Sequence, residues 1–412
     1  MIRNTCFSMG ARHNHVAILD KHMVHKSIIY LVKRSPPFML KLSQAYVGAE
    51  EKEAVSRVFD NLYLGMGAEV RLFEQELLTF ITEDNTTSSR QIACVNTGTS
   101  ALQLALQACD IGKGDEVLIP SMTYAASFQA ASATGATAIA CDVDLITGCI
   151  DIADAEPRIN HRTKAIMHVH YAGGYGDLVG IYALAKKYGL RVIEDAAHSF
   201  GSTYNGRRIG ARGDIICFSF DGLKNITCGE GGAVISSDTD VIKRVQDLRL
   251  LAIENDTEKR FSGQRSWDFD IKEQGWRYHM SNINAAIGRA QLKKLPLFSE
   301  IRKKFYRMYY DGIPTTIGTP IQIDRHNCVP YPFVLRVDAA KRDRLADHLN
   351  ANGIETGIHY KPNHLLSYYK GRGKGCPVAE QLWGEILSLP MHCNLSEDDI
   401  QFVIQTICNA DL

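Results

Sequence analysis

From residue 91 onward, short runs of β-branched and other apolar residues alternate with segments of helical hydrophobic period. The expected strands are QIACVN, DEVLIP, TAIACDVD, TKAIMHVHYAG and LRVIEDAAH, and the expected helices between them are ALQLALQAC, AASFQAASATG and LVGIYALAKKYG. This alternation is typical of a mostly parallel sheet sandwiched by helices. The sequence therefore predicts an α/β fold with ligands near the carboxyl ends of the strands.

The pattern changes after residue 238, where the sequence predicts a long helix over 240–253, a polar loop over 254–270 and another helix over 282–295. We place a domain boundary at Leu295-Pro296. The prediction is a large domain over 39–295 and a small C-terminal α/β domain over 296–412 with antiparallel strands. Residues 1–38 are rich in His, Lys and Arg without a clear period, so we expect a disordered extension.

Composition limits the classes of partner. Of 412 residues 45% are hydrophobic, and 46 basic residues balance 46 acidic ones, with no long basic block. We therefore expect small-molecule substrates and no nucleic-acid partner.

The eleven cysteines are an odd number without a CxxC pair, which indicates reduced thiols. No run of about eighteen apolar residues and no signal peptide is evident, so we expect a cytoplasmic protein without a membrane partner.

Two turns that follow expected strands carry polar side chains. In NTGTSALQLAL, Gly98, Thr99 and Ser100 lie at a strand-to-helix turn, where free amides and the helix dipole favour a phosphate. The same residues also suit an ordinary helix cap. VIEDAAHS ends an apolar strand with Glu194, Asp195 and His198, and an acid at a strand end is either functional or a turn former.

Other strand ends add an aromatic residue, two imidazoles and a lysine. Tyr124 follows a strand and either stacks on a planar ligand or packs against its neighbours. His168 and His170 share one face of a strand, but no third metal ligand is near in sequence. Lys224 lies between an apolar strand and the glycines of GEGG, which allow close backbone approach, so it is either a surface lysine or a partly buried reactive amine.

Together these parts are what a protein needs to hold pyridoxal phosphate (PLP). A lysine forms a Schiff base with the PLP aldehyde. An acid keeps the pyridine nitrogen protonated, which makes the ring an electron sink. The lysine amine, once released, can carry a proton between the substrate carbon and the cofactor.

The residues resemble the sugar-nucleotide aminotransferases of the DegT/DnrJ/EryC1/StrS family, which have the type I PLP fold. The resemblance covers roughly residues 40–410. The matching passages are NTGTSALQLAL, GDEVLIPSMTYAAS, VHYAGGYGD, VIEDAAHSFGSTYNGRRIG, GDIICFSFDGLKNITCGEGGAVI, GWRYHMSNINAAIGRAQL and GIHYKPNH.

The resemblance implies roles for individual residues. Lys224 corresponds to the lysine that binds PLP covalently, Asp195 to the partner of the pyridine nitrogen, and His198 to the residue that bonds the ring hydroxyl. The remaining cofactor-binding residues implied are the ring-stacking Tyr124 and, around the phosphate, Gly98, Thr99, Ser100 and Ser219. His359, Tyr360 and His364 fall where the family approaches the sugar nucleotide, although they also suit a structural turn.

The family further implies a homodimer with shared active sites, because the passage matching GWRYHMSN adds a phosphate contact to the neighbouring subunit. Here Arg277 stands where many members have Asn, so the charge suits a phosphate while the geometry differs.

The implied activity is transfer of the amino group of L-glutamate to a nucleotide-linked keto-6-deoxy sugar, giving an amino sugar for a surface polysaccharide or glycan such as O-antigen. GEGG at residues 229–232 is more similar to members that act at sugar C4 than to those that act at C3, which often have GDGG.

Other activities of the same fold, and other nucleotide-binding sites, fit the sequence less well. A dehydratase branch of the fold has His in place of the lysine, whereas Lys224 is present here. A lyase or desulfurase usually needs a catalytic cysteine on a loop, and a catalytically silent PLP-binding regulator has no need of Lys224 and Asp195. A dinucleotide or nucleoside-triphosphate site fails on glycine spacing.

Overall fold

A seven-stranded sheet forms the centre of the structure, in the order β1-β9-β8-β5-β4-β2-β3. Its strands are β1 (Gln91–Val95), β2 (Glu116–Pro120), β3 (Thr137–Cys141), β4 (Thr163–Val169), β5 (Arg191–Asp195), β8 (Ile215–Ser219) and β9 (Gly232–Ser236). Neighbouring strands from β3 to β8 are parallel, and β9 runs antiparallel to both β8 and β1. The predicted mostly parallel α/β sheet is therefore confirmed.

The computed structural model describes residues 39–83, 89–371 and 374–412. Residues 40–412 form one unit, to which the following description applies. The predicted extension over 1–38 lies outside the described residues. Within the described part no helix has the length and apolar character needed to cross a bilayer, and its ten cysteines are free thiols.

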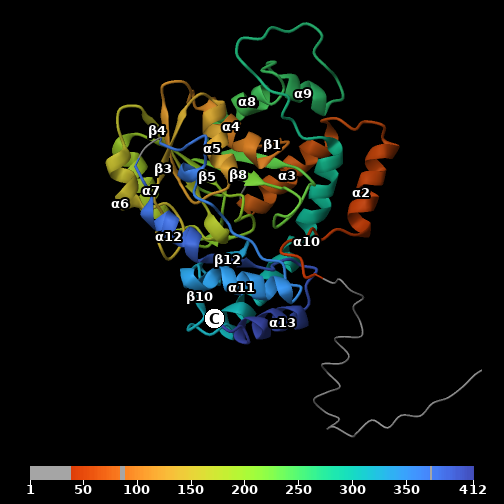
Figure 1. Ribbon diagram of the computed structural model, residues 1–412. Helices are drawn as coiled ribbons and strands as arrows, with labels where there is room; N and C mark the ends of the chain where they lie inside the picture. The colour runs from red at the N-terminus through yellow and green to blue at the C-terminus, as the bar shows by residue number, and fades with distance from the viewer. Residues whose placement is uncertain (1–38, 84–88, 372–373) are drawn as a thin grey trace, which may run out of the picture. The chain divides into compact units, whose positions relative to one another are not determined.

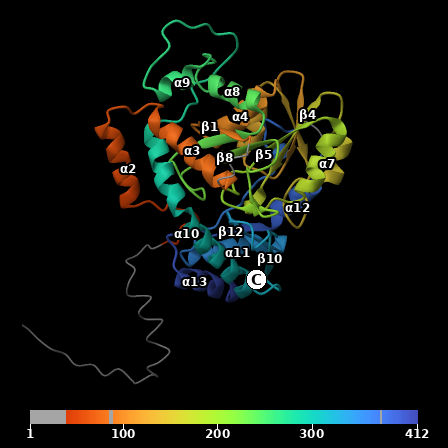
Figure 2. The same cartoon turned by 180° about the vertical axis from the view of Figure 1, so that it is seen from behind.

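Helices cover both faces of the sheet (Figures 1 and 2). One face packs against α4 (Gly98–Ala108), α5 (Ala125–Ala133) and α8 (Thr239–Leu248). The other packs against α3 (Ala68–Thr82) and α7 (Leu178–Tyr188). Because strand side chains alternate between faces, Ile193 and Asp195 point towards α4 and α5, whereas Val192 and Glu194 point towards α7.

The remaining elements are shorter or lie towards the two ends of the unit. They are α2 (Ala49–Asp60), α6 (Ile152–Ala155), η1 (Glu156–Arg158), η2 (Tyr171–Gly173), the hairpin strands β6 (Thr203–Tyr204) and β7 (Arg207–Arg208), α9 (Asp256–Phe261), α10 (Asn282–Gly312), β10 (Gly318–Pro320), β11 (Phe333–Val337), α11 (Ala339–Ala351), η3 (Asn363–Leu365), α12 (Pro377–Glu385), β12 (Ile386–Leu389) and α13 (Glu397–Cys408).

Strands β10, β11 and β12 form the predicted antiparallel C-terminal sheet. The expected boundary at Leu295-Pro296 falls inside α10, which continues through Pro296. This helix contributes Leu295 and Phe298 to the core beside α3, and Phe305 to the core beside β11. Leu40 packs in the second of these cores. The division into two domains at residue 295 stays a prediction.

Local signals explain where several helices begin and end. Asp177 caps α7 by accepting from the Gly180 amide, and Gly189 ends it with a left-handed φ of 67°. Helix α8 ends at Leu248, earlier than predicted, because Leu251 and Ala252 adopt positive φ. The segment expected to be a loop over 254–270 contains α9.

Candidate active site

Asp195 is the last residue of β5, and only 7% of it is exposed. Its Oδ2 accepts a hydrogen bond from Ser127 Oγ of α5 at 2.8 Å, and its Oδ1 accepts from the Ala197 amide at 3.2 Å. Burial raises the pKa of this carboxyl, while the bonds from Ser127 and Ala197 and the charge of Lys224 oppose the rise. Asp195 is thus a buried acid without an ion-pair partner among the described residues, and a bound cation would stabilise its charged form.

His198 lies in the turn that follows β5 and is buried. Its Nε2 is 3.2 Å from the Tyr360 hydroxyl, and its ring centroid is 4.8 Å from that of Tyr331. Within the described part of the chain its Nδ1 has no hydrogen-bond partner. Burial, with the positive charge of Lys224, holds the pKa of His198 well below its ordinary value, so the ring is neutral at pH 7. A neutral imidazole with one free nitrogen can accept from or donate to a bound ligand.

Lys224 follows β8 in a turn closed by the bond from its amide to the Asp221 carbonyl, 3.1 Å long. The side chain is half-buried, and Nζ lies 4.7 Å from the centroid of the Tyr331 ring. Its positive charge opposes the rise in the Asp195 pKa and lowers the pKa values of His198 and His359. The charge of Lys224 therefore acts on side chains that are far from it in the sequence.

Two tyrosines line this environment. Tyr124 precedes α5 with 61% of its surface exposed, so its ring is open to a ligand. Its centroid is 5.7 Å from that of Tyr360, whose hydroxyl contacts His198. The structure brings Tyr124, Tyr360 and His198 into a continuous group.

The turn before α4 is a helix cap, as one of the two sequence interpretations expected. Thr97 Oγ1 accepts from the Ser100 amide at 3.0 Å, and Ser100 Oγ donates to the Asn96 side chain at 2.8 Å. Thr99 is exposed. The amides of the first helical turn lie at the positive end of α4, so the cap does not remove the capacity to bind an anion.

Close backbone packing joins this turn to β8 and β9. A Cβ added to Gly98 would lie 2.7 Å from the Cβ of Ser219, and one added to Gly232 would lie 2.4 Å from the Thr97 carbonyl oxygen. Ser219 is buried, and its Oγ accepts weakly from the Asp221 amide at 3.4 Å. The glycines thus shape a turn that no larger residue would leave intact.

The other predicted site residues have different surroundings. Arg277 is exposed, forms a strand-like bridge with Leu250 and makes no ion pair with any described residue. His364 uses both ring nitrogens within the protein, 2.6 Å from Ser121 Oγ and 3.0 Å from Glu380 Oε1. Both contacts are those expected of a residue that stabilises a structural turn, the alternative to substrate binding for His364.

His359 lies between the small sheet and Lys224. Its Nδ1 is 2.8 Å from Ser388 Oγ of β12, and its carbonyl accepts from the Tyr171 hydroxyl. Burial and the charge of Lys224 lower its pKa to about 4.

The imidazoles of the HVH sequence make protein contacts. His168 Nε2 is 3.0 Å from the Tyr175 carbonyl, and His170 Nε2 is 2.8 Å from Glu194 Oε2.

Two residues of the site were not anticipated from the sequence. Ser127, the donor to Asp195, is three residues after Tyr124, so the shared face of the first turn of α5 was a usable signal. Tyr331, which lies beneath Lys224 and beside His198, comes from a distant connection without any local signal.

The residues present fit PLP. The buried carboxylate suits a protonated ring nitrogen, the free Nδ1 of His198 suits a polar ring substituent, and the glycine-shaped turn at α4 suits a phosphate. Lys224 is the amine beside them.

Comparisons with known proteins agree with this fit. The profile of the DegT/DnrJ/EryC1/StrS aminotransferase family matches residues 45–408. DesV of S. venezuelae, solved as a complex with a ketimine intermediate, is 33% identical, with 87% of this chain and 93% of that chain covered and a TM-score of 0.78. DesI, solved with its TDP-sugar product, is 27% identical over 91% of this chain and 93% of its own, with a TM-score of 0.79.

A third similar structure is Spr1654 of Streptococcus pneumoniae in its PLP form, with 26% identity, a TM-score of 0.81, and 90% of this chain and 98% of that chain covered. Because the family profile spans most of the sequence and the residues fit its cofactor, this chain belongs to the DegT/DnrJ/EryC1/StrS family of PLP-dependent sugar aminotransferases.

Proposed function

We propose that this aminotransferase moves the amino group of L-glutamate to C4 of a nucleotide-linked 4-keto-6-deoxyhexose. The observation that carries the transamination is the convergence of Lys224, Asp195 and His198 in one site. The C4 position is supported by GEGG at residues 229–232, and glutamate is supported by family resemblance. The enzyme would make this amino sugar in the cytoplasm, for incorporation into a surface polysaccharide or glycan such as O-antigen.

In this proposal each residue holds one part of PLP. Lys224 carries the covalent link, Asp195 pairs with the ring nitrogen, His198 binds the ring hydroxyl and Tyr124 stacks on the ring. The phosphate is held by the backbone and side chains at the α4 turn and β8, that is, by Gly98, Thr99, Ser100 and Ser219. His359 and Tyr360 face the sugar nucleotide, and His364, also predicted there, positions the loop that holds them.

PLP, when bound, supplies an electron sink for the carbanion formed at the substrate carbon. Asp195 keeps the positive charge at the ring nitrogen by remaining ionised, and Ser127 fixes its orientation through the 2.8 Å hydrogen bond. Once released from its link to the cofactor, the Lys224 amine would take the proton from the α-carbon of the donor and deliver it to the cofactor carbon to which Lys224 had been bound. The Tyr331 ring, whose centroid is 4.7 Å from Nζ, shields one side of this amine from water.

The test is an absorbance spectrum of the PLP-loaded protein before and after L-glutamate, compared with L-glutamine and L-alanine. We expect glutamate to convert the cofactor to its amine form, and Lys224→Ala to abolish this conversion while Lys187→Ala, at an exposed position, retains it. If none of the three donors converts the cofactor in the wild type, the amino-transfer proposal is refuted. If only glutamine or alanine converts it, that amino acid replaces glutamate as the proposed donor.

The carbon is tested separately with the amine-loaded enzyme. Purified nucleotide-linked 4-keto-6-deoxy and 3-keto-6-deoxy hexoses are supplied in turn, and the product is identified by NMR. The proposal predicts turnover of the 4-keto sugar at least about tenfold faster. Faster turnover of the 3-keto sugar would move the reaction to C3.

We also propose a homodimer in which the segment around Arg277 reaches the partner's phosphate site. Support comes from the loop between α9 and Arg277, which stands out beyond α8 in Figure 1 and carries the exposed side chains of Trp267, Phe269 and Ile271. Light scattering should give twice the chain mass, and Trp267→Ser with Phe269→Ser should shift the protein towards monomer. A wild-type monomer that is fully active would refute shared sites.

A further inference from the structure

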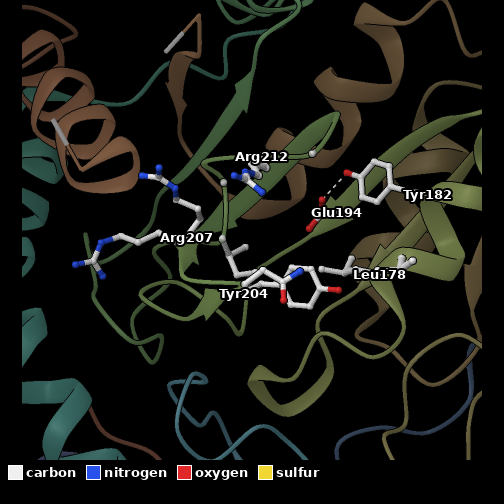
Figure 3. Close-up of a pocket in the computed structure, with 12 residues that line it drawn as sticks. Leu178, Tyr182, Glu194, Tyr204, Arg207 and Arg212 are labelled. Atoms are coloured by element: carbon white, nitrogen blue, oxygen red, sulfur yellow. Dashed lines mark hydrogen bonds between the residues drawn. The ribbon is translucent and has the colours of Figure 1, made fainter. Parts of the chain in front are cut away.

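A second pocket lies on the face of the sheet opposite to Asp195 (Figure 3). Glu194 and Asp195 are consecutive in β5, so their side chains point to opposite faces. The pocket has a volume of about 360 Å³, within the range of small-molecule sites. It lies between the first turn of α7, the β6–β7 hairpin and the segment that leads into β8. None of the predicted cofactor-binding residues lines it.

Glu194 lines the bottom of this pocket, and its carboxylate already has hydrogen-bond partners within the protein. Glu194 is 3% exposed, and its Oε1 accepts from the Tyr182 hydroxyl at 2.6 Å while its Oε2 is 2.8 Å from His170 Nε2. Burial alone would raise the pKa of Glu194, but the bonds from His170 and Tyr182 lower it overall. The floor therefore needs no donor from a ligand.

Three arginines give one side of the pocket a positive charge. Arg207 and Arg208 share the carboxylate of Glu83 at the long distances of 3.6 and 3.8 Å. The Arg208 guanidinium also lies over the Phe80 ring at 3.9 Å, which holds it in place. Arg212 is exposed and forms no ion pair with any residue that the structure describes. In Figure 3 it lies between Arg207 and the Glu194–Tyr182 pair.

The rest of the pocket is mainly apolar, with Asn205 of the β6–β7 turn as its remaining polar side chain. Leu178 and the 66% exposed Val179 come from α7, and the Tyr204 ring is fixed edge-on against Tyr175 with centroids 4.7 Å apart. Figure 3 shows Tyr204 and Leu178 close to each other along one edge of the pocket. Arg212 lines the same pocket as this apolar edge.

We propose that this pocket binds a small amphipathic anion, in which an apolar ring carries a carboxylate, sulfonate or phosphate group. The acidic group lies at Arg212, where a charge-assisted hydrogen bond forms, and the ring contacts Leu178, Val179 and Tyr204. This site is independent of the sugar-nucleotide site.

The test uses two fluorescent probes with the same rings and different charge, anilinonaphthalene sulfonate and the uncharged N-phenylnaphthylamine. Each is titrated into the PLP-loaded protein after removal of unbound cofactor. We expect saturable binding of one sulfonate probe per chain. Arg212→Glu should weaken sulfonate binding at least about tenfold and change binding of the uncharged probe by less than about twofold.

Val179→Glu places a carboxylate on the wall that the ring contacts, so it should weaken binding of both probes and weaken binding of the sulfonate probe more strongly. Val179 is exposed in the first turn of α7, where the helix dipole stabilises an acidic side chain, so we expect this variant to fold. It therefore tests the anion site even if Arg212→Glu fails to fold. Arg307→Glu, at an exposed position on α10, is the matched control and should bind both probes as the wild type does. No saturable sulfonate binding, or equal binding in Val179→Glu and the wild type, would overturn the proposal.

Discussion

The buried carboxylate of Asp195 is the residue on which the candidate chemistry depends most. Its hydrogen bond comes from Ser127 in the first turn of α5, the helix that Tyr124 directly precedes. An acid and its donor on separate elements keep a fixed orientation only while both elements stay in place. This makes Ser127 a positioning residue in our proposal.

Ser127→Ala should lower kcat/KM about tenfold, because a hydrogen bond to a charged group contributes about 1.5–3 kcal/mol and part of this is recovered by water. Ser132→Ala is the control on the same helix, since Ser132 donates to the Phe128 carbonyl and not to Asp195. Steady-state kinetics and the PLP absorbance band check this. An unchanged kcat/KM in Ser127→Ala would remove the residue from the mechanism.

Asp195→Asn should separate activity from stability. We expect a loss of at least about 100-fold in kcat, since the amide cannot hold a positive ring nitrogen. Burial raises the pKa of Asp195, so at pH values above the ordinary pKa of an aspartate the need to ionise this carboxyl lowers the stability of the cofactor-free fold. The cofactor-free variant at pH 8 should therefore melt no lower than the wild type. A marked drop in its melting temperature would indicate a structural role.

At the scale of elements, the turn before α4, which we propose holds the phosphate, depends on how closely β9 approaches α4. Gly232 pairs with Val95 in β1 and Ser219 in β8, so three strands converge beside Thr97. The GEGG run was expected to allow tight packing, and the contact of Gly232 with the Thr97 carbonyl accounts for its last glycine.

Gly232→Ala should therefore weaken PLP binding and destabilise the fold by about 1–3 kcal/mol, the usual cost of overpacking. Gly65→Ala is the matched control, because a Cβ there would meet nothing within 4 Å. PLP titration and urea denaturation measure the two effects. If Gly232→Ala binds PLP as tightly as Gly65→Ala, the turn does not hold the phosphate.

At the scale of the whole molecule, several buried or half-buried histidines are held in the neutral form. Burial lowers the pKa of His168 to about 3 and, with the charges of Arg277 and Lys224, those of His279 and His359 to about 4. Such a residue binds its proton more readily in the unfolded chain. Its contribution to stability is present above the unfolded pKa of 6.5 and is lost as the pH falls towards the folded value.

The free energy of unfolding of the cofactor-free protein should thus fall between pH 6.5 and 4.5, by up to about 1.4 kcal/mol per pH unit for each such histidine. Urea denaturation at several pH values measures the slope. His279→Gln should flatten it, whereas His161→Gln, at an exposed position, should leave it unchanged. A slope that His279→Gln does not alter would contradict the assignment.

Over residues 91–195 the sequence by itself determined the order of the main strands and helices, because the alternating apolar runs and the stop at Gly189 are local signals. It also indicated which residues follow each strand, among them Lys224 and Asp195. Only the tertiary structure decided their surroundings. Tyr331 lies beneath Lys224, α10 continues through Pro296, and both nitrogens of His364 are occupied because residues distant in sequence pack together there. Such contacts depend on how whole elements dock, which no short segment encodes alone.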